Sequence, residues 1–127
     1  AVAGSLTNTA ETAVLEELFN TSGVYTTPFK CALVTVIGTD SAAGTECTGG
    51  SYARQTISFA AASGGSITTN ADLTFTSMPA CTVVGVDIFD SNGSPVRVAW
   101  ASLAANKTVG AGDTLVIPTG SLTVTLD

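Results

Sequence analysis

The sequence predicts an all-β domain, an antiparallel β-sandwich or jelly-roll-like fold with one short N-terminal amphipathic helix. From Thr26 onward, runs rich in Val, Ile, Thr and Phe alternate with clusters of Gly, Ser, Asn and Asp, as in short strands joined by turns. These runs recur about every eight to twelve residues with no helix between them, which argues against a parallel α/β sheet. Only one segment, near the N-terminus, has apolar residues at helical spacing.

The helix is expected over residues 9–20. Asn8 followed by Glu11 fits a capping box, in which each side chain satisfies a backbone N–H of the first turn. Glu16 and Glu17 fall on the face expected in solvent. The apolar positions form a stripe on the opposite face: Val14, Leu15, Leu18 and Phe19. Because so short a helix is marginal alone, the stripe must dock on the chain's own sheet or on a neighbouring subunit. Burial within an oligomer is the favoured expectation.

About seven to nine strands are expected along the rest of the chain. Residues 29–37 are apolar nearly throughout, as in a central strand, whereas residues 53–59 alternate as in a half-exposed strand. Residues 38–51 are predicted to be a loop, long enough to suspect a binding or contact role. Asn92-Gly93 between two apolar runs is the strongest hairpin signal. The other strands are expected near residues 66–69, 72–76, 83–89, 96–103, 107–109, 113–117 and 121–126.

Length and composition indicate one weakly charged domain spanning residues 1–127. Charged residues make up 11% of the chain and the net charge is −6, while 12 Ser and 21 Thr supply a hydroxyl-rich surface. Such a chain lacks the basic surface that binds nucleic acid phosphates, so no nucleic-acid partner is expected. The longest apolar run, near residues 33–37, is far shorter than the roughly 20 residues of a membrane helix, so no membrane partner is expected. The first residues also lack the pattern of a secretion signal.

The residues that carry chemistry are few. The chain has no histidine, which excludes catalysis by a His base and His-ligated metals. Cys31, Cys47 and Cys81 are expected to be free thiols, with Cys31 buried, although a single bridge between Cys47 and Cys81 stays open.

Asp87, Asp90 and Asn92 match a calcium loop only in part, and a hairpin turn favours the same residues. The three glutamates of the helix are expected to form a solvated face rather than a pair of catalytic carboxylates. We therefore predict no catalytic residue, no cofactor and no metal site.

Arg54 is the most informative charged residue, since it is one of only four cations in an acidic chain. Tyr52 lies two positions before it and is expected on the same face of a strand. A bidentate ion pair between Arg54 and Glu46 is predicted. These three residues join the helix stripe as candidate interface residues.

Several segments of the chain resemble one family over nearly the whole length. They cover residues 13–19, 24–28, 32–35, 44–55, 59–65, 70–75, 86–90, 107–114 and 120–126. The most specific block runs from Thr45-Glu46 to Tyr52-Ala53-Arg54. The family is that of small tailed-bacteriophage virion proteins labelled head-decoration or tail-fibre-like proteins. Cys47 and Cys81 depart from its pattern.

The resemblance implies a non-enzymatic virion structural protein made in the bacterial host cytoplasm. Its partners are expected to be the major capsid protein or other virion proteins, and the helix stripe suggests a homo-oligomer, a dimer or trimer. A capsid decoration or cement protein that stabilises the head lattice is the leading expectation, because small size, weak charge and a dockable helix suit that role. A tail or fibre-associated protein that contacts a host receptor or glycan is the alternative, and a small hydrolase is a distant third.

Overall fold

The computed structural model describes residues 4–21 and 23–126; the ends of the expected 1–127 domain and Ser22 lie outside the described residues. Within these ranges, one helix is followed by nine strands. The elements are α1 (Asn8–Phe19), β1 (Lys30–Val36), β2 (Thr45–Glu46), β3 (Gln55–Thr56), β4 (Ser66–Thr68), β5 (Leu73–Phe75), β6 (Cys81–Phe89), β7 (Arg97–Val109), β8 (Leu115–Ile117) and β9 (Thr123–Thr125).

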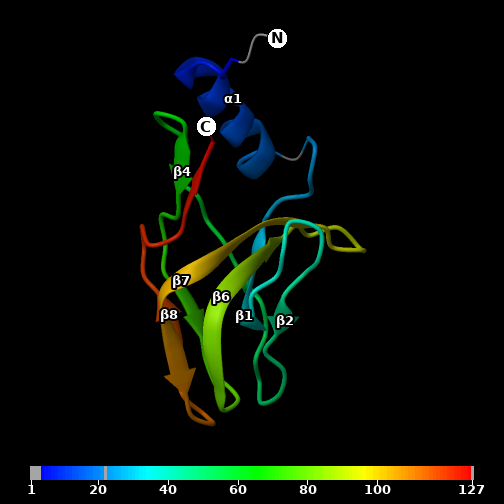
Figure 1. Cartoon of the computed structure of the whole chain (residues 1–127), viewed down its shortest axis with the longest axis vertical. Coiled ribbons are helices and arrows are strands. Elements are labelled where there is room, and N and C mark those ends of the chain that lie inside the picture. Colours follow the sequence, from blue (N-terminus) through cyan, green and yellow to red (C-terminus); the bar gives the residue numbers. More distant parts are fainter. Residues whose placement is uncertain (1–3, 22, 127) are drawn as a thin grey trace.

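The strands form one larger sheet and two small ones. The larger sheet has the order β2-β1-β6-β7, with β3 also paired to β1, while β4 pairs with β9 and β5 pairs with β8. Every one of these pairings is antiparallel. Figure 1 shows the helix at one end of the molecule, close to β4 and the C-terminal segment. The predicted all-β fold with one N-terminal helix is confirmed.

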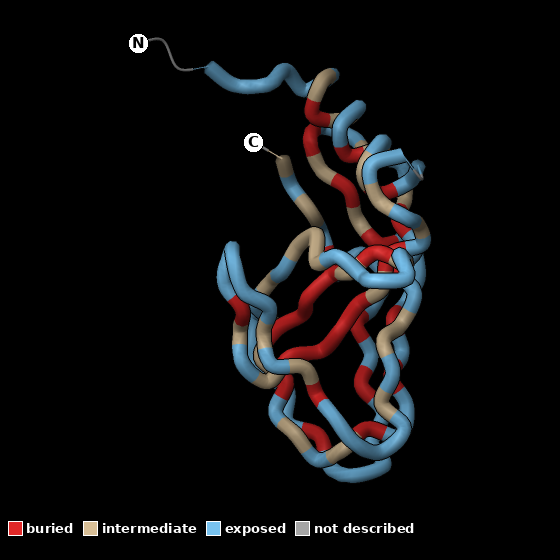
Figure 2. The backbone as a smooth tube through the Cα atoms, turned by 90° about the vertical axis from the view of Figure 1, so that its right-hand side faces the viewer, coloured by how far each residue is buried: buried red, intermediate tan, exposed pale blue. Residues whose placement is uncertain are grey.

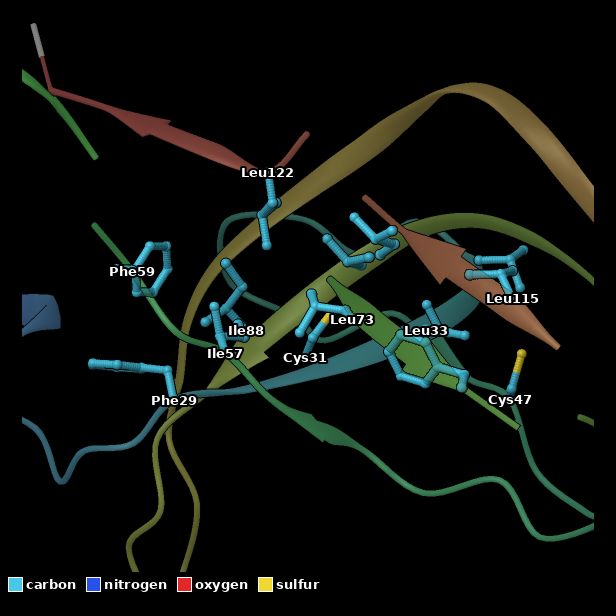
Figure 3. Close-up of a cluster of buried hydrophobic side chains, with 14 of the residues drawn as sticks. Phe29, Cys31, Leu33, Cys47, Ile57, Phe59, Leu73, Ile88, Leu115 and Leu122 are labelled. Atoms are coloured by element: carbon cyan, nitrogen blue, oxygen red, sulfur yellow. The ribbon is translucent and has the colours of Figure 1, made fainter. Parts of the chain in front are cut away.

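The core lies between one face of the larger sheet and the β5–β8 pair, and it continues along the β4–β9 pair to the helix. Alternate residues of β1 and β6 supply the first layer: Cys31, Leu33, Val86 and Ile88. The β5–β8 pair supplies the second layer: Leu73, Phe75, Leu115 and Ile117. Ile67 of β4 is also buried and extends the core toward the helix. Figure 3 shows Leu73 and Leu115 of the β5–β8 pair in one cluster with Cys31, Leu33 and Ile88 of the larger sheet, and Figure 2 shows buried backbone running through the centre with exposed segments around it. Burial of every second residue along a strand is typical of a sheet that packs through one face.

The opposite face of the larger sheet is covered by the segment after β1. Gly85 of β6 permits this close approach, because a Cβ there would lie 2.2 Å from Ile37 Cδ1 and 2.4 Å from the Ala101 carbonyl oxygen. Asp87, on the covered face, accepts a hydrogen bond from the Gly44 N–H at 2.9 Å. Ala32 is consequently fully buried although it points away from the core.

Three strand predictions need correction. The predicted loop at 38–51 contains β2, because Thr45 and Glu46 complete their backbone hydrogen bonds on the edge of β1. The predicted strand at 53–59 is reduced to β3, which pairs with only two residues of β1. The strands predicted at 96–103 and 107–109 are one strand, β7, in which the four residues 103–106 bulge opposite the single residue Val84.

The start of the helix also differs from its prediction. Thr7, and not Asn8, is the N-cap, since its side chain accepts from the Ala10 N–H at 3.2 Å. Glu11 therefore does not close a capping box with Asn8. Glu11 is only 7% exposed and lies against Gly65, so its expected place on a solvated face is wrong, whereas Glu17 is exposed as predicted.

Candidate interaction surface

Glu46 is the centre of a cluster of polar side chains beside β1. Arg54 donates to it through Nε at 3.0 Å and through Nη2 at 2.9 Å, one bond to each carboxylate oxygen. The Tyr52 hydroxyl donates to Glu46 Oε2 at 2.7 Å and accepts from the Leu33 backbone N–H at 2.9 Å. The predicted bidentate pair is confirmed, and Tyr52 lies on the same carboxylate.

The fold positions each member of this cluster. Glu46 lies opposite Val34 in the β1–β2 pairing. The Tyr52 ring stacks on Phe75 in the core, with ring centroids 6.2 Å apart. The guanidinium carbon of Arg54 is 3.9 Å from the centroid of the Phe89 ring, a cation–π contact. Tyr52 and Arg54 precede β3 and are not on a strand, so their shared direction comes from the contacts with Glu46 and not from strand alternation.

The electrostatics of the cluster favour the ionised pair. Burial acts to raise the pKa of Glu46, but hydrogen bonds from Arg54 and Tyr52 and the charge of Arg54 outweigh it, so the pKa lies below its ordinary value. Burial and the hydrogen bond to Glu46 raise the pKa of the Tyr52 hydroxyl. Burial raises the pKa of the Cys31 thiol to about 12. A permanently paired carboxylate and a protonated thiol suit structure better than acid–base or nucleophilic chemistry.

Arg54→Ala is expected to lower the free energy of unfolding by about 1–2 kcal/mol, because it removes a half-buried bidentate pair and a cation–π contact. Chemical denaturation at pH 7 measures the loss. The control is Lys107→Ala, an exposed position on β7 that forms no ion pair among the described residues.

The same variant has a defined pH dependence. Because the folded pKa of Glu46 is depressed, its contribution is complete above its unfolded pKa near 4.3 and is lost as the pH falls through the folded value. The stability difference between wild type and Arg54→Ala should therefore shrink at acid pH. An equal difference at pH 7 and at pH 3, or none at pH 7, would contradict the role of the pair.

The apolar stripe of the helix is divided between core and solvent. Leu15 is 2% and Phe19 is 5% exposed, and both belong to the chain's own core. Phe19 contacts Phe29 and Phe59, with ring centroids 5.0 and 5.1 Å away. Leu18 packs at the margin of the core, and Val14 is 37% exposed. The chain thus covers Leu15 and Phe19 without a partner, while Val14 faces outward.

The free edge of β7 is a surface that the sequence analysis did not single out. Among the described strands, β7 pairs only with β6, so its second edge offers N–H and C=O groups to solvent or to a partner. Trp100 on β7 is 43% exposed, and Val96, the residue before the strand begins, is 45% exposed. An apolar groove of about 450 Å³ lies between β7 and the β8–β9 region, with Leu103, Leu115 and Leu122 in its lining.

Asp87 and Asp90, the residues of the partial calcium pattern, have structural partners. Asp90 accepts from the N–H groups of Val96, Asn92 and Thr26, and the hydrogen bond from Val96 is foremost in lowering its pKa. Asp87 is 2% exposed and forms an ion pair with Arg97 at 3.5 Å. Arg97 also donates to the Thr39 carbonyl. The aspartates therefore hold the hairpin turn and the segment that covers the outer face of the sheet.

The described residues lack two kinds of feature, a metal-binding cluster and a membrane-spanning helix. No group of three or more His, Cys, Asp or Glu side chains is arranged to hold a metal ion in the described part of the chain. Within residues 4–21 and 23–126, the structure has no helix of the length and hydrophobicity needed to span a bilayer.

The fold and these surfaces define a small β-rich structural domain with an ion-paired polar cluster and an open strand edge. A family model described as Podophage GP4 fiber I protein gp80 matches residues 5–125, and the chain belongs to this family. It is therefore a structural protein of the phage virion. No curated protein matches the chain.

Proposed function

We propose that the protein is a non-enzymatic component of a fibre on the virion of a short-tailed phage, where it binds other virion proteins. The main support for this proposal is the match to a fibre protein family over residues 5–125. This supports the fibre alternative over capsid decoration, the leading expectation from the sequence. Small size, weak charge and a short helix suit a decoration protein, but a fibre component can have the same properties.

The open edge of β7 supports a role in assembly. An additional strand from a partner can complete the backbone hydrogen bonds there, and side-chain contacts at Trp100 and Val96 can select the partner. The hydroxyl-rich surface also favours association, because uncharged hydroxyls cost less to desolvate than charged groups.

The exposed members of the predicted interface set are secondary contact candidates. Val14 faces solvent on the helix, and Arg54 and Glu46 retain side-chain exposures of 31% and 28% while paired. These positions lie outside the groove beside β7. We propose them as contacts to a second neighbour in the particle or to another copy of the chain.

Copy number and position on the particle test the proposal. In purified virions, quantitative gel densitometry against the major capsid protein is expected to give a few copies per particle, with immunogold label at the fibres. Antibody against an unrelated internal virion protein serves as the labelling control. Hundreds of copies with label over the head would overturn the fibre assignment in favour of capsid decoration.

A further inference from the structure

Two of the three thiols face each other at one end of the core. Cys47 Sγ and Cys81 Sγ are 3.0 Å apart, and both thiols are free. A disulfide has an S–S bond of about 2.05 Å, so an approach of about 1 Å would bring these sulfurs to bonding distance. We propose that Cys47 and Cys81 are an oxidation site, which closes to an intramolecular disulfide when a low-molecular-weight disulfide oxidises it.

The backbone holds both cysteines in place for this reaction. Cys47 directly follows β2, and its N–H donates to the Leu33 carbonyl at 2.9 Å. Cys81 begins β6 and pairs with Val109 of β7. Because these backbone hydrogen bonds hold both residues beside each other, we expect closure by side-chain rotation within the existing sheet.

The third thiol is separate from this pair. Cys31 is fully buried in β1, and its thiol is free. Figure 3 shows Cys31 in the middle of the hydrophobic cluster and Cys47 near the end that lies away from Phe29. Cys81 is half-buried, so a soluble oxidant reaches it more readily than either of the other two.

The reaction is a two-step thiol–disulfide exchange. The thiolate of Cys81 attacks one sulfur of the oxidant's S–S bond and releases one small thiol. The Cys47 thiol then gives up its proton to solvent, and its sulfur displaces the second small thiol from Cys81. In sum, two cysteine thiols are oxidised to one disulfide, and the oxidant is reduced to two thiols.

A virion protein meets both reducing and oxidising surroundings. In a bacterial cytoplasm the pair stays reduced, whereas a released particle meets oxidising surroundings. The bond would join positions 34 residues apart in sequence, and so would tie the segment that holds Tyr52 and Arg54 to the start of β6. A cross-link of this span restricts the unfolded chain and stabilises the folded one.

Mass spectrometry of the purified full chain tests the proposal, with oxidised glutathione as the probe. After exposure and alkylation of the remaining thiols, wild type and Cys31→Ser should each contain one internal bridge, equivalent to the loss of about 2 Da as two hydrogen atoms. Peptide mapping should join Cys47 to Cys81. The Tm of oxidised wild type should rise by roughly 10 °C and fall back on reduction.

Cys47→Ser and Cys81→Ser are the decisive variants. Each keeps a side chain close in size to cysteine and removes one of the two sulfurs of the bridge. Neither should form the bridge or gain thermal stability on oxidation. A wild type with three alkylated thiols, a bridge to Cys31, a stable glutathione adduct or a covalent dimer as the main product would each overturn the proposal. A Cys47–Cys81 bridge with an unchanged Tm would overturn its stabilising role.

Discussion

Phe19→Ala is expected to lower the free energy of unfolding by about 3–5 kcal/mol, the cost of truncating a buried aromatic side chain. Phe19 is 5% exposed, and its ring contacts the rings of Phe29 and Phe59. Its removal leaves a cavity where the helix meets the β-domain. Since small domains have a total stability of about 5–15 kcal/mol, the loss should be evident in urea denaturation and in Tm.

Val14→Ala is the matched control on the same helix. Val14 is 37% exposed, so its truncation should change stability by no more than about 0.5 kcal/mol. If Phe19→Ala were as mild as the control while the molar mass in solution fell, the helix would belong to a subunit interface. A large loss for Phe19→Ala with an unchanged molar mass would place it in the subunit's own core.

The parts of the fold that depend on local signals were predictable. The apolar spacing of Val14 to Phe19 locates the helix to within one residue, and only the cap is displaced, because Thr7 and Asn8 are both good capping residues. The hairpin at Asn92-Gly93 joins β6 to β7 as expected. Both features are decided by residues close together in sequence.

Features that depend on distant partners were not predictable. Thr45 and Glu46 lie in a glycine-rich segment, and they become a strand only because β1 offers an edge. The bulge at residues 103–106 looks like a break between two strands, since the pairing with β6 resumes only at Lys107. Alternation of apolar and polar residues shows which face of a strand is buried, but it does not show which other strand pairs with it.

The sequence predicted one of the two ion pairs, Arg54 with Glu46, and did not predict the other, Arg97 with Asp87. Arg54 and Glu46 stand out because cations are rare and the two residues lie eight positions apart. The pair of Asp87 and Arg97 escapes notice because a charge in a strand normally points to solvent. The sequence does carry a signal for this pair: Asp87 is the one charged residue of the largely apolar strand β6, and such a carboxylate is normally buried only with a partner.

Arg97→Ala is expected to lower the free energy of unfolding by about 3–5 kcal/mol, a larger loss than for Arg54→Ala. The Asp87 carboxylate is 2% exposed, and without Arg97 its hydrogen bond among the described residues is the one from the Gly44 N–H at 2.9 Å. A buried charge without its counter-charge is costly. Because Arg97 also binds the Thr39 carbonyl, the segment over the outer face loses a contact as well.

A double variant separates the buried charge from the lost packing. Asp87→Asn removes the negative charge and keeps an oxygen for the Gly44 N–H, so adding it to Arg97→Ala should restore a substantial part of the stability. Chemical denaturation measures the recovery, and hydrogen exchange at Gly44 reports whether the covering segment stays closed. If the double variant were less stable than Arg97→Ala alone, the unpaired charge would not be the cause, and the loss would lie in the packing and hydrogen bonding of the Arg97 side chain.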